Sequence, residues 1–195
     1  MLTTEALAQM VADEWRAQAA LVDFEAMRAT RLAGVALDAG PAAHSELAQR
    51  LAEYAGDDLL CYFAHQPAAL FRRQELAWEP LIAWADQLGL TFRRTVGIGH
   101  VDQAPETLAA IEDLALGLEN FQLTGLVAAA QLFGSTILAL ALMKRRLTGD
   151  DAFAASQIDE TFQAEAWGED AEASARAAAM RAEARMLDHW FEALN

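Results

Sequence analysis

The stretch Leu123–Met143 (LTGLVAAAQLFGSTILALALM) contains no charged side chain. Its composition predicts one long helix that begins at Phe121 or Leu123 and ends at Met143. A helix of this length could cross a lipid bilayer, and the basic residues 144–146 follow it as a cytoplasmic anchor would. A transmembrane protein is therefore one interpretation of this stretch.

The polar side chains in and beside the stretch favour a second interpretation. Gln122, Gln131, Ser135 and Thr136 interrupt its apolar character, and the rest of the chain is strongly polar. Several flanking segments have the spacing of amphipathic helices, whose apolar stripes need a surface to pack on. We favour a central helix buried in a bundle over a membrane span.

On the N-terminal side, apolar spacing predicts a helix over residues 4–20, capped by Thr3 or Thr4. A second helix is expected over residues 43–55, ending at Gly56. The segments Leu59–Phe63 and Thr91–Val96 have the pattern of short buried strands that could pair with each other.

Prolines mark three further helix starts. Pro67 and Pro80 each predict a short helix, the second running to Leu88 before Gly89, because proline suits a first helical turn. Pro105 predicts a helix that reaches about Leu118.

On the C-terminal side, Thr148 and Asp151 have the spacing of a capping box that opens a helix to about Ala166. Gly168 is expected to end it, and Asp170 to cap a last helix that reaches about Ala193. The predicted fold is mainly α: a single domain over residues 1–195, built as a multi-helix bundle around a central apolar helix, with a small two-stranded β element.

The chain carries 29 acidic and 14 basic side chains, a net charge of -15. This charge disfavours a nucleic acid as partner, because phosphate backbones are bound by Lys and Arg. It suits a basic protein surface, or it serves only to keep the chain in solution. The single Cys61 excludes an internal disulfide, and the N-terminus resembles no targeting signal. We expect a cytoplasmic protein in bacteria, or a mitochondrial matrix protein in a eukaryote.

Catalytic motifs are incomplete. Cys61 and His65 are four residues apart, but in a strand leading into a loop this spacing does not bring the two side chains together. The run Gly97-Ile98-Gly99 lacks the lysine and third glycine of phosphate loops and predicts a turn. No Glu-x-x-His pair of a di-iron bundle is present. We expect no metal site and no cofactor.

An acidic cluster surrounds a tryptophan at the predicted junction of the last two helices, in the stretch IDETFQAEAWGEDAE over residues 158–172. Acids without a catalytic partner suit recognition better than catalysis, although acid–base chemistry would be possible in a cleft. Acids in a first helical turn also stabilise the helix dipole, and Glu172 lies four residues before Arg176. Sequence leaves these roles open.

A set of short fragments carries a family resemblance and follows the family's order over nearly the whole chain. The fragments are Ala12–Trp15 with Gln18, Thr30–Leu32, Cys61–Tyr62, Arg73–Gln74 with Trp78–Leu81 and Trp84, Gly97–Ile98, Gly134–Ser135 with Leu138–Leu140, and Asp159–Glu160 through Gln163 to Trp167–Glu172. With them the chain resembles the assembly chaperones of the F-type ATP synthase that hold its alpha subunit, the ATP-twelve family.

The resemblance implies a non-enzymatic chaperone that binds the unassembled alpha subunit until a beta subunit replaces it. It points to Glu172 first as a partner-binding residue, then to Glu169, Asp170 and Asp159. Gln163 and Trp167 either support the helix junction or touch the partner, and for Trp167 we favour a place in the core. The N-terminal β domain of the family is expected to be absent.

Two departures from the family pattern bear on the partner contacts. Arg28 stands after Met27 where a proline is usual, and Phe63 stands where an arginine is usual. The main alternative function is a helical domain that binds a small apolar ligand between its helices. A hydrolytic enzyme that uses the carboxylates and a membrane protein are the remaining alternatives.

Overall fold

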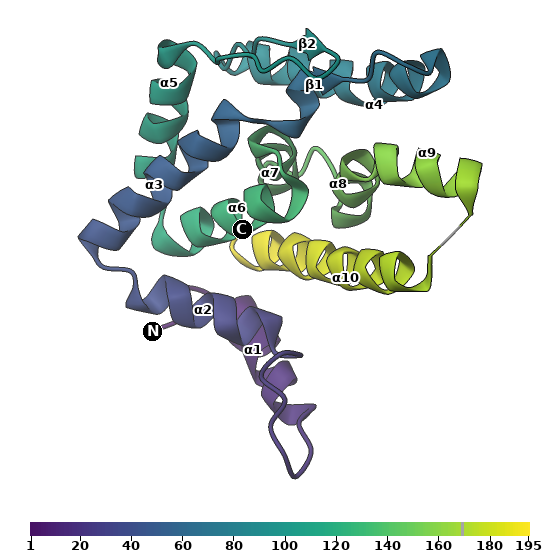
Figure 1. The fold of residues 1–195 in the computed structure, drawn as a ribbon. Helices are drawn as coiled ribbons and strands as arrows, with labels where there is room; N and C mark the ends of the chain where they lie inside the picture. Colours follow the sequence, from purple (N-terminus) through teal and green to yellow (C-terminus); the bar gives the residue numbers. More distant parts are fainter. Residues whose placement is uncertain (169) are drawn as a thin grey trace.

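The structure is a computed structural model that describes residues 1–168 and 170–195. Its helices are α1 (Glu5–Arg16), α2 (Arg28–Asp38), α3 (Pro41–Gly56), α4 (Ala68–Gln87), α5 (Pro105–Leu116), α6 (Asn120–Phe133), α7 (Thr136–Met143), α8 (Gly149–Ser156), α9 (Ile158–Trp167) and α10 (Ala171–Ala193). Two short strands, β1 (Tyr62–Phe63) and β2 (Thr95–Val96), complete it (Figure 1). The predicted fold class, mainly α with a small β element, is confirmed.

The apolar stretch at the centre of the molecule forms two helices, so the prediction of one helix up to Met143 was wrong. Gly134 adopts the left-handed conformation at φ 63°, and Ser135 caps α7 by accepting a hydrogen bond from the Leu138 N–H at 3.0 Å. The Asp58 carboxylate accepts a further one from the Ile137 N–H at 3.0 Å. These acceptors replace the helical bonds that the break removes.

α7, the second half of the predicted central helix, lies at the centre of the molecule. Its residues Thr136 to Leu142 are all buried, with α3, α4, α6, α8 and α10 packed around it (Figure 1). Among the described residues, no helix has the length and apolar character needed to cross a membrane. A helix that is apolar on all sides here fills the core of a bundle.

α10 crosses α6 at a point where only glycine fits. A Cβ on Gly125 would lie 2.6 Å from the indole nitrogen of Trp190, whose N–H donates to the Phe121 carbonyl at 3.1 Å. Trp190 is fully buried. This contact joins the last helix to the centre of the molecule.

The β element is smaller than predicted. β1 and β2 pair in parallel, Tyr62 with Thr95 and Phe63 with Val96, which confirms that the two segments pair. The residues before β1, Leu59–Cys61, form a 3-10 turn instead of a strand, because Asp58 caps it by accepting from the Leu60 N–H at 3.0 Å. After β2 the chain bends at Gly97, at φ 91°. This agrees with the predicted turn.

Residues 68–87 form one helix, so the prediction of a new helix at Pro80 was wrong. A proline within a helix leaves the carbonyl four residues earlier without its donor. That residue is Leu76, which is 78% exposed and lies on the solvent side of α4. Trp78, Leu81 and Ile82 are buried on both sides of Pro80, and their packing keeps the helix continuous.

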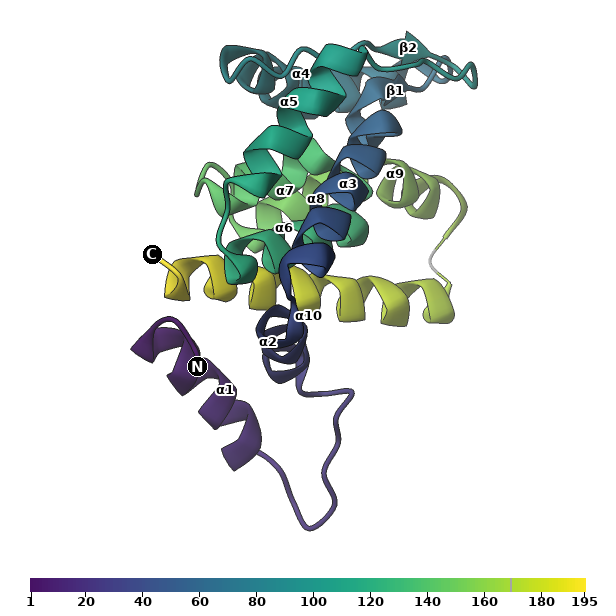
Figure 2. The same ribbon diagram turned by 90° about the vertical axis from the view of Figure 1, so that its left-hand side faces the viewer.

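The N-terminal region contains the predicted first helix and one helix that was not predicted. The Thr4 hydroxyl caps α1 by accepting from the Leu7 N–H at 3.1 Å. α1 ends at Arg16, before the predicted end, and leads by a loop into α2 (Figure 2). The Glu14 carboxylate accepts from the N–H groups of Ala29 and Thr30 at 2.8 and 2.7 Å, which secures the start of α2.

The predicted helix over residues 148–166 is also divided in two. The capping box of Thr148 and Asp151 is confirmed, but α8 ends at Ser156 and α9 begins at Ile158. Asp170 caps α10 by accepting from the Ala173 N–H at 3.2 Å, and α10 ends at Ala193 as predicted. The described acids of the stretch 158–172 therefore lie along α9 and at the start of α10.

Candidate functional site

α9 is held on the surface of α4 by polar contacts. The Arg73 guanidinium donates to both carboxylate oxygens of Glu165, at 2.9 and 2.6 Å, and lies 5.1 Å from the centre of the Phe162 ring. The guanidinium lowers the pKa of the Glu165 carboxyl, and the same pair raises the pKa of Arg73. α9 buries none of its residues fully, so these contacts decide where it lies.

Asp159 belongs to the same attachment. The buried amide of Gln74 donates to the Asp159 carboxylate at 2.6 Å, and its oxygen accepts from the Ala64 N–H at 2.7 Å. Gln74 thus connects α4, the chain after β1 and the first turn of α9. Asp159, one of the predicted partner-binding residues, has a structural contact within the chain.

Trp167 lies at the C-terminal end of α9 and is 83% exposed, so its predicted place in the core was wrong. No further turn of α9 follows to cover it, because Gly168 ends the helix at φ 95°. Gln163 is also exposed and lies four residues earlier, on the same face of the helix. The end of α9 therefore presents an uncovered tryptophan.

The other predicted acids lie across the junction. Asp170 is exposed and caps α10, and Glu172 is exposed in the first turn of that helix. Glu169 lies outside the described residues. The structure thus places Asp170, Glu172 and Trp167 at one end of the α9–α10 pair, whereas Asp159 lies at the other end of α9.

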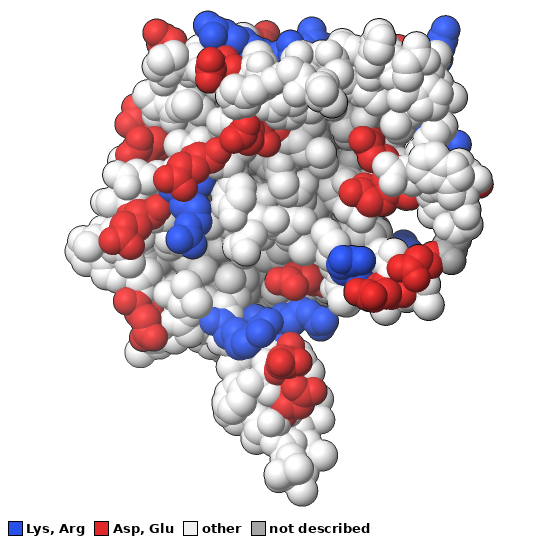
Figure 3. Space-filling model, viewed as in Figure 1, with Lys and Arg blue, Asp and Glu red and all other residues white. Residues whose placement is uncertain are grey.

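An open groove of about 570 Å³ separates α9 from α10, and Figure 3 shows it at the right of the molecule. Apolar side chains line much of it, and charged groups lie at its edge. Its lining residues are Phe153, Gln157, Glu160, Thr161, Ala164, Asp170, Ala173, Ser174, Arg176, Ala177 and Met180. An apolar surface with charged edges is the common arrangement of protein-binding sites.

α10, the second wall of the groove, is fixed to α8. Arg181 and Arg185 donate to Asp150 at 2.7 and 2.9 Å, and this pairing lowers the pKa of the Asp150 carboxyl. A Cβ on Gly149 would lie 2.3 Å from the Ala184 carbonyl oxygen, so the two helices touch through backbone.

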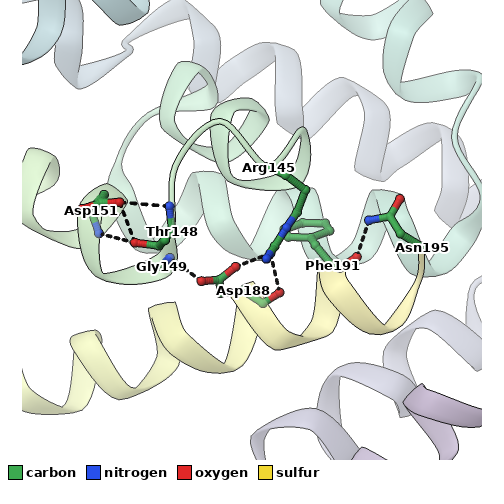
Figure 4. Close-up of polar contacts among 7 residues, drawn as sticks. All are labelled: Arg145, Thr148, Gly149, Asp151, Asp188, Phe191 and Asn195. Carbon is green, nitrogen blue, oxygen red and sulfur yellow. Dashed lines mark hydrogen bonds and ion pairs between the residues drawn. The ribbon is translucent and has the colours of Figure 1, made fainter.

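Farther along α10, Asp188 joins the helix to the turn before α8 (Figure 4). Its carboxylate accepts from the Gly149 N–H at 2.8 Å and pairs with the guanidinium of Arg145. Arg145 has a positive φ of 59°, which turns the chain sharply after α7. Both walls of the groove therefore rest on elements of the core.

The residues considered for catalysis are dispersed. Cys61 is buried whereas His65 is exposed, as predicted, so the two do not share a site. Burial raises the pKa of the Cys61 thiol well above its ordinary value, which keeps it in the unreactive thiol form. Across residues 1–168 and 170–195, no three His, Cys, Asp or Glu side chains gather in a way that could hold a metal ion.

Sequence reasoning did not assign the groove-lining alanines or Met180 to the site. Alanines in a long helix were interpreted as helix-favouring residues, and their position on the groove depends on where α9 lies. The sequence indicates Arg73 and Gln74 only through the family resemblance, although they attach α9, the first wall of the groove, to α4. Their acceptors, Glu165 and Asp159, lie 92 and 85 residues away in sequence.

Comparisons with known proteins agree with this fold. The family model described as ATP12 chaperone protein matches residues 1–86. Atp12 from Paracoccus denitrificans is 40% identical, with 100% of this chain and 84% of that chain covered and a TM-score of 0.91. A mutant of P. denitrificans Atp12p gives 39% identity, 100% and 83% coverage and the same TM-score.

A third structure, the Atu1473 protein from Agrobacterium tumefaciens, is 35% identical, with 98% of this chain and 72% of that chain covered and a TM-score of 0.90. The α9–α10 groove lies beyond the residues that the family model matches, but the Paracoccus structures cover it. Identity at this level over the whole chain, together with the family model, shows common descent. This chain belongs to the ATP12 chaperone protein family.

Proposed function

We propose that this chain binds the unassembled alpha subunit of the F-type ATP synthase and prevents its aggregation until a beta subunit takes its place. The observation that carries the proposal is the similarity to Atp12 over the whole chain. An assembly subunit without its neighbours exposes an apolar interface that would otherwise aggregate. Covering that surface reversibly needs neither a cofactor nor catalysis, and the task belongs in the cytoplasm where subunits are made.

The α9–α10 end of the molecule has the chemistry that such a client requires. Between residues 158 and 176 the described acids are Asp159, Glu160, Glu165, Asp170 and Glu172, against one base, Arg176, which leaves a net charge of five minus one, or four negative. The exposed Trp167 lies among them. A large aromatic side chain supplies binding energy, and the surrounding charge selects a basic partner.

Size-exclusion chromatography tests the proposal directly. The chain is mixed with freshly refolded alpha subunit, and with beta subunit in a parallel run. We expect co-elution with alpha alone and less light scattering from alpha during refolding. Absence of a complex with alpha, or equal binding to beta, would contradict the proposed client.

The volume of the groove between α9 and α10 supports one other function, the binding of a small apolar ligand. The space between α9 and α10 is large enough for a molecule of this kind. Such a ligand would raise the melting temperature of the chain, and above its Kd the rise would grow with the logarithm of the ligand concentration, whereas alpha subunit would have no effect. A thermal shift assay with both additions separates the two functions.

A further inference from the structure

Two further depressions lie next to the groove between α9 and α10, because they share lining residues with it or with each other. A depression of about 270 Å³ shares Phe153, Gln157 and Thr161 with it. A third depression, of about 540 Å³, shares Ala154 and Ile158 with the second. We call the three together the α8–α9 groove: α8 and α9 line it along its length, and α4 and α10 border its two ends.

The chemistry of the groove changes along its length. The α4 end is mainly apolar, with Pro80, Leu81 and Leu147. It also carries Arg146, whose guanidinium lies 5.4 Å from the centre of the Trp84 ring, and Asp151, which is engaged in the capping box of α8. The middle is bordered by Arg73 and Arg181, each already paired with an acid of the chain.

The α10 end of the groove combines small apolar residues with acids. Ala173, Ala177 and Met180 line the α10 wall, and Glu160 and Asp170 lie at the edge. Glu172, the residue before Ala173 in the first turn of α10, adds a third acid beside this end, and Arg176 is the one base among these residues. The charge of this end is therefore negative.

We propose that the α8–α9 groove binds an amphipathic helix of the client protein, apolar face inward, with Lys or Arg residues at the α10 end. The identity of the client rests on the proposed function, but the shape and charge of the groove do not depend on it. A groove between helices that is lined largely by apolar residues is the usual receptor for an amphipathic helix. The acids at one end give the bound helix a direction.

Other occupants fit the charge less well. A second copy of this chain carries a net charge of -15 and would meet the acidic end with like charge. Anionic lipid headgroups would be repelled in the same way. A client strand would need a sheet edge to extend, and β1 and β2 are two residues long each and lie outside the groove lining.

Paired tryptophan substitutions on α10 test the proposal. Ala177 lines the groove, whereas its neighbour Ala178 is exposed and is not among the lining residues. Ala177→Trp therefore fills the groove, and Ala178→Trp is a control of the same volume outside its lining. The probe is a fluorescein-labelled helix of about 15 residues, with Leu on one face and Lys near one end. Fluorescence anisotropy gives the Kd of the full chain and of both variants.

We expect Ala177→Trp to raise the Kd for the probe about tenfold or more, and Ala178→Trp to leave it within about twofold. A probe with the same composition but a scrambled face should bind weakly, and Glu in place of Lys should weaken binding. If Ala177→Trp does not fold, Ala164→Trp fills the groove from α9, with the exposed Ala166→Trp as its control.

Failure of this proposal and failure of the proposed function give different results. If alpha subunit co-elutes equally with the unchanged chain and with Ala177→Trp, the groove proposal is overturned and the proposed binding of alpha subunit stands. If the helical probe binds but no complex with alpha subunit forms, the groove proposal is supported and the proposed binding of alpha subunit is overturned. Equal Kd values for Ala177→Trp, Ala178→Trp and the unchanged chain, or binding to the scrambled probe as tight as to the amphipathic one, overturn the groove.

Discussion

At the scale of single residues, Asp58 is the side chain on which the centre of the molecule depends. It is fully buried and accepts hydrogen bonds from the start of the 3-10 turn and the start of α7, at Leu60 and Ile137. Burial raises its pKa to about 6 from 3.8, and the hydrogen bonds to the carboxylate reduce the rise. One carboxyl group thus caps two elements at a cost in desolvation.

The titration of Asp58 predicts a pH dependence. With a raised pKa, the folded state keeps its proton where the unfolded chain has lost it, so this group's contribution to the free energy of unfolding falls as pH rises from about 4 to about 6. Asp58→Asn removes the titration. Relative to the variant, the unchanged chain should lose about 2 kcal/mol between about pH 4.5 and about pH 7.5.

Urea unfolding followed by circular dichroism measures this difference at each pH. Comparing the two proteins cancels the other carboxyl groups, which titrate in both. A difference that does not change with pH would mean that Asp58 is ionised in the folded state throughout that range, as it is in the unfolded chain.

Glu172 is the exposed acid at the start of α10 on which the family resemblance places most weight. Glu172→Lys reverses its charge beside the groove and should raise the Kd for alpha subunit about three- to tenfold at low salt, while the circular dichroism spectrum is unchanged. Titration calorimetry measures the Kd. Glu192→Lys makes the same change at the exposed far end of α10 and should leave it unaltered. Equal values for both variants would remove Glu172 from the site.

At the scale of elements, the crossing of α8 and α10 depends on one glycine. A Cβ on Gly149 would meet the Ala184 carbonyl oxygen at 2.3 Å, so Gly149→Ala must push the helices apart. We expect the free energy of unfolding to fall by about 1–3 kcal/mol. Gly34 lies within α2, and a Cβ at this position would have nothing within 4 Å. Gly34→Ala should therefore raise the free energy of unfolding by about 0.4–1 kcal/mol. Chemical denaturation of both variants checks the opposite signs.

Features formed by residues close in sequence could be predicted, and features that depend on contacts between distant residues could not. The caps at Thr4, Thr148 and Asp170 each bond within three residues, so sequence spacing was sufficient to find them. The break between α6 and α7 depends on Asp58, 79 residues before the N–H that it accepts. α2 was missed because its buried face consists of alanines, which give a weak apolar pattern.

At the scale of the whole molecule, the sequence located the acidic junction but not the surface around it. The charge and the tryptophan are contiguous in sequence, and they remain together in the fold. The groove itself is formed by α4, α8, α9 and α10, whose relative positions depend on Arg73, Gln74 and Asp150 meeting partners far along the chain. Trp167 was misplaced for the same reason, since its exposure follows from where α9 lies.

The net charge of -15 leads to a last prediction, which concerns the rate of client binding. Attraction between an acidic chaperone and a basic client surface speeds encounter and is screened by salt. The association rate constant with alpha subunit should fall about tenfold between about 20 and 200 mM salt, with little change in the dissociation rate constant. Stopped-flow tryptophan fluorescence measures both constants.

Glu172→Lys should make the association rate constant less dependent on salt. An association rate that salt leaves unchanged would mean that the charge serves only to keep the chain in solution, and the client would then be selected by the apolar groove alone.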